Sequence, residues 1–189
     1  MQRRGSSEPS RAHSPAAVGS VCRVEDIIGQ TVEPLAGRGS CGIAQPVRVV
    51  RVAGVRLSRP ATMDCRTARA LRSWVETGVK PTLGRFGWEA IRLEIAGGYA
   101  CRTINNRPGG DISEHGRGRA IDISGISLSN GYTITLTDGW NRRAEGQVLR
   151  RLQRAACGPF GTVLGPDADR FHRDHFHFDT KPRRTPYCR

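Results

Sequence analysis

The segment His172-Arg-Asp-His-Phe-His-Phe-Asp179 alternates polar and aromatic residues over its second half. Because successive side chains of a β-strand point to opposite faces, this alternation predicts a strand near the C-terminus. The two phenyl rings would anchor the strand in a core, and His175, His177 and Asp179 would share the other face. Neutral imidazole is a common zinc ligand, so this face favours a metal or catalytic site. A solvated edge strand would explain the polar residues but not the regular aromatic alternation.

A second cluster of similar chemistry lies upstream, in Ser113-Glu-His-Gly-Arg-Gly-Arg-Ala-Ile-Asp122. Gly116 and Gly118 disfavour a helix, so we expect a loop that enters a strand, with Asp122 on its polar face. The alternative is a glycine-rich turn with a solvated His115. Two clusters in one chain favour the metal site, because two imidazoles and a carboxylate are a donor set typical of catalytic zinc. Such a site keeps one position open for water and polarises a carbonyl.

The remaining patterns predict an α+β fold with a small antiparallel sheet flanked by helices. Apolar residues at helical spacing indicate one helix that begins near Asp64 and ends at Pro81 or Gly84. A second helix is expected over 148–156. Alternating or turn-bounded apolar runs indicate further strands over 46–57, 91–95, 120–124, 132–137 and 163–164. Residues 102–118 are rich in Gly, Asn, Pro and Arg, and they predict a long functional loop.

The chain has 189 residues and carries 30 Lys+Arg against 17 Asp+Glu, a formal net charge of +13. A basic surface attracts anionic molecules without sequence specificity, so the charge restricts the partners to that class. No basic-aromatic motif typical of nucleic-acid binding occurs, and we expect no specific nucleic-acid partner. No apolar run reaches about 18 residues, so we expect no transmembrane segment. The oligomeric state stays open.

Six widely spaced cysteines without a CxxC pair indicate long-range disulfides, which form in an oxidising compartment. Sequence does not choose among the possible pairings. Residues 1–20 are rich in Ser, Pro, Arg and Gly, and we expect a disordered tail there and one domain over 21–189. The tail has no apolar stretch of signal-peptide length, so we expect the true start to lie upstream of Met1; unconventional export and a cytosolic protein are the alternatives.

Residues 113–122, SEHGRGRAID, resemble the first zinc motif, SxHxxGxAxD, of the zinc peptidases that act on D-amino-acid peptides of bacterial cell walls. That superfamily includes lysostaphin-type enzymes, D-alanyl-D-alanine carboxypeptidases and the hedgehog signalling domain. Residues 172–177, HRDHFH, are particularly similar to the penicillin-insensitive murein endopeptidases. From about Cys65 to Asp179 the chain looks like the bacterial extensin-like C-terminal domain family, in segments such as ATMDCRTARAL, YACR and FGTVLGPDADRFHRDHFHFD. The resemblance implies a fold like that of hedgehog and the D-Ala-D-Ala peptidases.

Carried over residue by residue, the resemblance implies that His115, Asp122 and His177 bind a zinc ion. It places His175 beside the metal, where it would polarise the substrate carbonyl or stabilise a tetrahedral oxyanion. The dipeptidase and carboxypeptidase relatives use a glutamate three residues before the last ligand as general base, where this chain has the shorter Asp174. Here a strict strand would turn that carboxylate away from the metal, unless a bulge intervenes.

Two further residues are candidates for roles in catalysis. His172 stands where the murein endopeptidases have a histidine, so it competes with Asp174 for the task of orienting the attacking water. Arg102 is a candidate clamp for the oxyanion or for a substrate carboxylate, because a guanidinium is planar and bidentate. The alternative for Arg102 is a surface arginine near a disulfide.

Together these features predict a zinc-dependent hydrolase of amide bonds in peptidoglycan peptides, acting as an endopeptidase or a carboxypeptidase. Its location would be periplasmic or extracellular, and its partners would be peptidoglycan peptides or another anionic polymer of the cell envelope. Two other functions remain open. One is a non-catalytic, zinc-containing domain that binds the cell wall, and the other is a metal-dependent nuclease.

Overall fold

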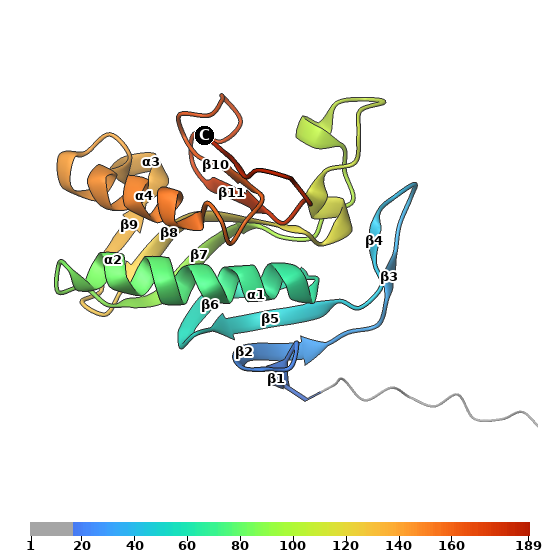
Figure 1. Cartoon of the computed structure of the whole chain (residues 1–189), viewed down its shortest axis with the longest axis horizontal. Helices are drawn as coiled ribbons and strands as arrows, with labels where there is room; N and C mark the ends of the chain where they lie inside the picture. Colours follow the sequence, from blue (N-terminus) through green and yellow to red (C-terminus); the bar gives the residue numbers. More distant parts are fainter. Residues whose placement is uncertain (1–16) are drawn as a thin grey trace, which may run out of the picture.

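The computed structural model describes residues 17–189 and is dominated by one large sheet (Figure 1). Ten strands form it, in the order β1-β2-β5-β6-β7-β8-β11-β10-β12, with β9 paired to β8. These strands are β1 (Gly19–Val21), β2 (Val24–Thr31), β5 (Val47–Val52), β6 (Val55–Met63), β7 (Ala90–Gly97), β8 (Ala120–Leu128), β9 (Thr133–Thr135), β10 (Thr162–Leu164), β11 (Phe176–Asp179) and β12 (Tyr187–Cys188). A separate two-stranded sheet pairs β3 (Leu35–Ala36) with β4 (Gly42–Ile43).

The α+β class is confirmed, but the expectation of a small, wholly antiparallel sheet is wrong. Strands β1, β2, β5 and β6 form an antiparallel meander, and the chain then crosses over so that β7 lies parallel to β6. This one parallel pair joins the meander to the rest of the sheet. At the far edge β12 also runs parallel to β10. The expected disordered tail lies outside the described residues up to position 16, and Gly19 and Ser20 belong to β1.

The expectation of one strand over 46–57 is wrong, because the chain turns back at Ala53-Gly54. Both turn residues have positive φ, 47° and 81°, as tight hairpin turns require. The turn joins β5 to β6, and Val52 pairs with Val55 across it. Both valines face the core, so the alternation of buried and exposed residues in the sequence gives no sign of the turn between them.

The helices lie mainly on one side of the sheet (Figure 1). They are α1 (Cys65–Trp74), the π-helical segment η1 (Val75–Val79), α2 (Lys80–Gly84), α3 (Leu136–Gly139) and α4 (Arg143–Ala156), with 3-10 turns η2 (Ile104–Asn106) and η3 (Glu114–Arg117). Asp64 caps α1 by accepting a hydrogen bond from the Thr67 backbone N–H at 2.7 Å, as the start signal predicts. Pro81 does not end the helix, because the π-helical segment before it accommodates the missing N–H.

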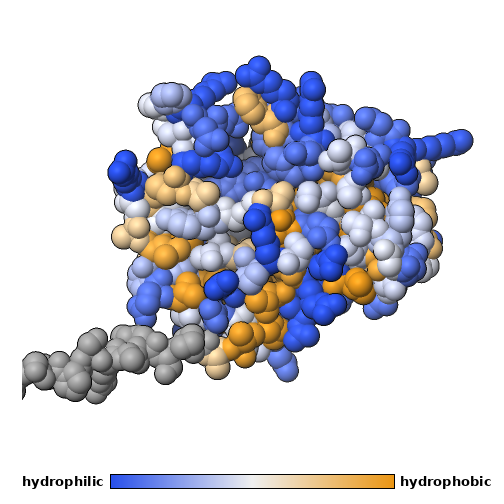
Figure 2. Space-filling view, turned by 180° about the vertical axis from the view of Figure 1, so that it is seen from behind, coloured by the Kyte–Doolittle hydropathy of each residue, from blue (hydrophilic) through white to orange (hydrophobic). Residues whose placement is uncertain are grey.

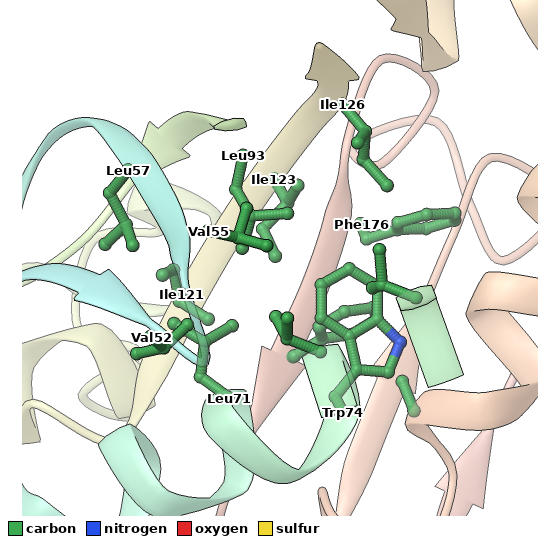
Figure 3. Close-up of a cluster of buried hydrophobic side chains, with 14 of the residues drawn as sticks. Val52, Val55, Leu57, Leu71, Trp74, Leu93, Ile121, Ile123, Ile126 and Phe176 are labelled. Atoms are coloured by element: carbon green, nitrogen blue, oxygen red, sulfur yellow. The ribbon is translucent and has the colours of Figure 1, made fainter. Parts of the chain in front are cut away.

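The core fills the space between the helices and the sheet (Figure 3). Trp74 of α1 packs edge-on against Phe178, with ring centroids 5.1 Å apart, and its indole N–H donates to the Leu152 carbonyl at 2.9 Å. Phe176 and Phe178 are 1% and 0% exposed, so the predicted alternation along β11 is confirmed. Phenyl rings on one face of β11 therefore hold its histidines on the other.

Disulfides are also as expected, and the structure supplies the pairing. Cysteine pairs 22–65, 41–101 and 157–188 are bonded, and the described residues include no free cysteine. Among residues 17–189, no helix combines the length and the hydropathy needed to cross a bilayer.

Candidate metal centre

Asp122 and His177 face each other on adjacent antiparallel strands. They are register partners in the β8–β11 pair, and Asp122 Oδ1 lies 2.9 Å from His177 Nδ1. On β8 the flanking Ile121 and Ile123 are fully buried in the core, so the alternation of the strand turns Asp122 to the opposite face. Sheet register alone therefore places a carboxylate and an imidazole side by side.

His115 reaches the same point from the loop before β8. Its Nε2 lies 3.1 Å from Asp122 Oδ1 and 3.1 Å from His177 Nδ1, and the residue is 1% exposed. Ser113 caps the η3 turn that carries it, and Gly118 ends that turn with φ +65°. A side chain at Gly118 would collide with Ile43, so the glycine is required for the close approach of β4. The three predicted ligands thus converge, with their donor atoms within 4.8 Å of one another.

The other nitrogen of each imidazole is held by a protein oxygen. His115 Nδ1 lies 2.8 Å from the Gly98 carbonyl oxygen, and His177 Nε2 lies 3.2 Å from Asp179 Oδ2. Such partners orient metal-binding histidines and make them more basic. Sequence analysis placed Asp179 on this face without a role and missed Gly98. The Gly97-Gly98 pair was the signal in the sequence that could have indicated a close approach of the backbone to the site.

Gly97 is a further residue that sequence analysis missed. A Cβ atom built on it would lie 2.3 Å from Asp122 Oδ2, so any larger residue would displace the carboxylate. Gly97 pairs with Asp122 across the β7–β8 ladder, where the register shifts. A glycine inside a strand often marks such a close approach.

The protonation of the metal-free cluster follows from its contacts. Burial alone would lower the pKa of His177, but hydrogen bonds with Asp122 and Asp179 outweigh burial and raise the pKa to about 9. Burial would raise the pKa of Asp122, yet its hydrogen bonds with His115 and His177 hold the pKa far below the usual range. These directions favour an Asp122 carboxylate paired with a protonated His177, so a cation that binds there would compete with a proton.

The donor set and its spacing fit a zinc ion. In tetrahedral zinc sites the Zn–N distance is about 2.0–2.1 Å, so two nitrogen ligands lie about 3.3 Å apart. The 3.1 Å between His115 Nε2 and His177 Nδ1 is close to that spacing. Two neutral imidazoles and one carboxylate leave a fourth position for water or substrate.

Residues 172–175 form a turn that leads into β11. This turn carries the other predicted site residues of the segment, His172, Asp174 and His175, and it fixes where their side chains lie. His175 Nε2 lies 3.8 Å from Asp122 Oδ1, so His175 borders the cluster. Its Nδ1 lies 2.7 Å from Asp174 Oδ1, and the Asp174 side chain is 71% exposed. Asp174 therefore contacts His175 and is not brought to the three ligands.

His172 packs beside the cluster instead. Its ring centroid is 5.6 Å from that of His177 and 5.4 Å from that of His175. Its Nδ1 lies 2.8 Å from Asp169 Oδ1. Burial lowers the pKa of His172 in spite of that carboxylate, so the imidazole is neutral near pH 7.

Three cavities of about 490, 810 and 320 Å³ reach the cluster. The first ends at His115 and Asp122, the second at His115 and His177, and the third lies among the histidines. Arg102 is half-buried and lines all three. Arg102 therefore borders every one of these cavities.

Comparison with known families gives one match. The family described as "Extensin-like protein C-terminus" matches residues 20–189, which is most of the chain. Searches of curated proteins and of solved structures find no match. The matched range covers all three ligands and both strands that carry Asp122 and His177.

Proposed function

The chain belongs to the extensin-like protein C-terminus family, and from that premise we propose that it is a zinc-dependent hydrolase of amide bonds in peptidoglycan peptides. The observation that supports the proposal most is the convergence of His115, Asp122 and His177 at the end of open cavities. The SxHxxGxAxD pattern of the wall peptidases adds to it, and we include in the proposal a fold related to hedgehog and the D-Ala-D-Ala peptidases.

His115 Nε2, Asp122 and His177 Nδ1 would hold the metal. Bound there, Zn²⁺ would act as a Lewis acid on a carbonyl and would lower the pKa of a water molecule. The Gly98 carbonyl and Asp179 would keep both rings in the orientation that this binding needs.

His175 is suited to stabilise negative charge on the substrate. Asp174 accepts a hydrogen bond from the Nδ1 of His175, and the Nε2 of His175 lies 3.8 Å from Asp122 Oδ1. An N–H at Nε2 would donate to the oxyanion that forms when water attacks the amide carbonyl. Asp174 would then be a positioning residue and not the base.

His172 is the better placed general base. Its Nδ1 is engaged by Asp169, so the neutral ring offers Nε2 as the proton acceptor. Burial lowers its pKa and keeps it unprotonated near pH 7. Arg102, which borders all three cavities, would bind a carboxylate of the peptide stem in a bidentate manner.

We also propose that the protein works in the cell envelope. Three disulfides support an oxidising compartment, periplasmic or extracellular. The net charge of +13 supports attraction to anionic wall polymers.

Mass spectrometry of defined muropeptides tests the activity. The zinc-loaded wild-type protein should release fragments that differ by hydrolysis of one amide bond, and His177→Ala should release none. His172→Ala should bind zinc normally and cleave slowly, by about 100-fold or more if the ring is the base. Cleavage at the wild-type rate by His177→Ala would refute the proposal.

The exposure of Asp174 favours a second function, a zinc-containing domain that binds wall polymers without cleaving them. Asp174 stands where the peptidase relatives have the base, yet its side chain is 71% exposed and bonded to His175 instead of facing the ligands. The zinc-loaded protein would then cosediment with purified sacculi and release no muropeptide fragment. Fragment release would exclude this second function.

A further inference from the structure

The sheet face opposite α1 carries two arginines without a counter-charge. Arg51 of β5 and Arg56 of β6 are exposed, and they are register partners across the antiparallel pair. Like charges directly opposite each other destabilise a sheet. Among the described residues neither guanidinium has a hydrogen bond or an ion pair, whereas the next arginine of the row, Arg92, lies 2.7 Å from Glu94. Both guanidiniums are therefore available to an anion.

Apolar side chains lie beside these two arginines. A groove of about 320 Å³ is lined by Val18, Ile28, Val50, Leu57 and Pro60 together with Arg51 and Arg56. Val18 is 61% exposed. Figure 2 looks onto the molecule from behind and shows apolar surface, interrupted by hydrophilic side chains, in the lower part of the view. Apolar area next to unpaired cationic groups is typical of surfaces that bind amphiphiles.

The groove lies next to a cavity of the candidate metal centre. Pro60 lines both the groove and the 490 Å³ cavity that ends at His115 and Asp122. Arg59, the neighbour of Pro60 in the chain, lines that cavity and donates a hydrogen bond to the Ala96 carbonyl. A large anionic surface that covers the groove would therefore lie beside this cavity.

We propose that this face docks onto the surface of an anionic lipid bilayer. A phosphate head group would lie between Arg51 and Arg56, and Val18 and Val50 would enter the boundary between head groups and acyl chains. The docking surface consists of these four residues with Ile28 and Pro60. The inference does not depend on the proposed hydrolase activity.

Charge disfavours the other occupants that the molecule itself could supply. A two-fold dimer with its axis through this face would place the same arginines against each other. Residues 1–16 carry three arginines and one glutamate, so this segment has the same sign as the docking surface. A soluble polyanion would pair with the arginines but would leave the apolar groove exposed.

Vesicle cosedimentation with the full chain tests the proposal. We expect the wild-type protein to bind vesicles of phosphatidylglycerol and phosphatidylcholine, and not vesicles of phosphatidylcholine alone. Arg51→Glu/Arg56→Glu should weaken the binding by about tenfold or more. The matched control is Arg66→Glu/Arg143→Glu, which changes the net charge equally at exposed positions of α1 and α4. Because both control residues lie in the first turn of a helix, glutamate is tolerated there.

Equal weakening by the test and control variants would overturn the proposal, since overall charge would then explain the binding. No binding by the wild-type protein would overturn it as well. Val18→Ser/Val50→Thr should also weaken binding, and an unchanged affinity would leave only a polyanion site, measurable with inorganic polyphosphate. A dimer in sedimentation velocity that Arg51→Glu/Arg56→Glu dissociates would assign the face to a second copy. His177→Ala should bind vesicles normally, so a failure of the hydrolase proposal leaves this outcome unchanged.

Discussion

His177 Nδ1 lies 2.9 Å from Asp122 Oδ1, and the two residues sit directly opposite each other in the antiparallel β8–β11 pair. Their neighbours on both strands are core residues, so a slip of either strand by one residue would turn that strand's ligand toward the core and separate the pair. Correct pairing of β8 with β11 therefore also brings together two of the three ligands of the candidate metal centre. Only His115 is brought in by a loop.

Removal of one ligand should abolish stoichiometric zinc binding. We expect the wild-type protein to retain one zinc per chain after gel filtration, and His177→Ala or Asp122→Ala to retain none, because two remaining donors hold the ion too weakly. Elemental analysis by mass spectrometry and calorimetric titration measure this. His172→Ala is the control and should keep its zinc, since its ring lies outside the three-donor cluster. Full zinc content in His177→Ala would contradict the assignment.

Gly97→Ala should damage the metal centre far more than Gly98→Ala. The added methyl would lie 2.3 Å from Asp122 Oδ2 at position 97, but at least 3.9 Å from any neighbour at position 98. We expect Gly97→Ala to weaken zinc binding at least about tenfold and to lower the free energy of unfolding by about 1–3 kcal/mol, as overpacking does. Zinc titration and urea denaturation of both variants provide the comparison. Equal zinc affinity in the two would show that Asp122 is not a ligand.

The stability of the metal-free protein should fall between pH 6.5 and 9. The pKa of His177 is raised to about 9, because its hydrogen bonds with Asp122 and Asp179 outweigh burial. A raised pKa in the folded state contributes stability below the unfolded value of about 6.5, and this contribution is lost as the pH rises through about 9. Asp122 has a lowered pKa, so its contribution is present above about 3.9 and is lost only in strong acid.

Chemical denaturation of the chelator-treated protein across this pH range measures the effect. His177→Asn should flatten the decrease, because asparagine does not titrate. Zinc affinity should rise over the same range, since the metal displaces the His177 proton. A His177→Asn variant with the wild-type pH profile would show that another group is responsible.

Loss of the Cys41–Cys101 disulfide should affect the metal centre as well as the fold. The Cys41 sulfur lies beside Gly116 of the η3 turn, and Cys101 precedes Arg102. We expect Cys41→Ser/Cys101→Ser to lower the free energy of unfolding by about 2–4 kcal/mol and to weaken zinc binding. Cys157→Ser/Cys188→Ser, at the far edge of the sheet, should lower stability but leave zinc binding nearly unchanged. Urea denaturation and zinc titration of the two pairs separate these effects, and an equal loss of zinc affinity would argue against a local role.

Local sequence patterns, which span only a few residues, were enough to predict several helices and strands. The alternation in β11, the start of α1 at Asp64 and the helical spacing from Leu71 to Val79 each predict a local structure that the protein adopts. Local patterns failed at Ala53-Gly54, where Val52 and Val55 face the same core from both sides of a turn. Periodicity records which residues are buried, and it does not record that the chain has reversed direction.

The sequence by itself determined which residues could form the candidate metal centre, because its imidazoles and carboxylates gather in two short segments, 113–122 and 172–179. It also determined that the cysteines form disulfides, but not which pairs form. Tertiary structure alone decided that Asp122 faces His177, that Asp179 and the Gly98 carbonyl support the rings, and that Asp174 turns to His175. Each of these depends on the register between strands or on the approach of distant loops, and a linear pattern does not contain those contacts.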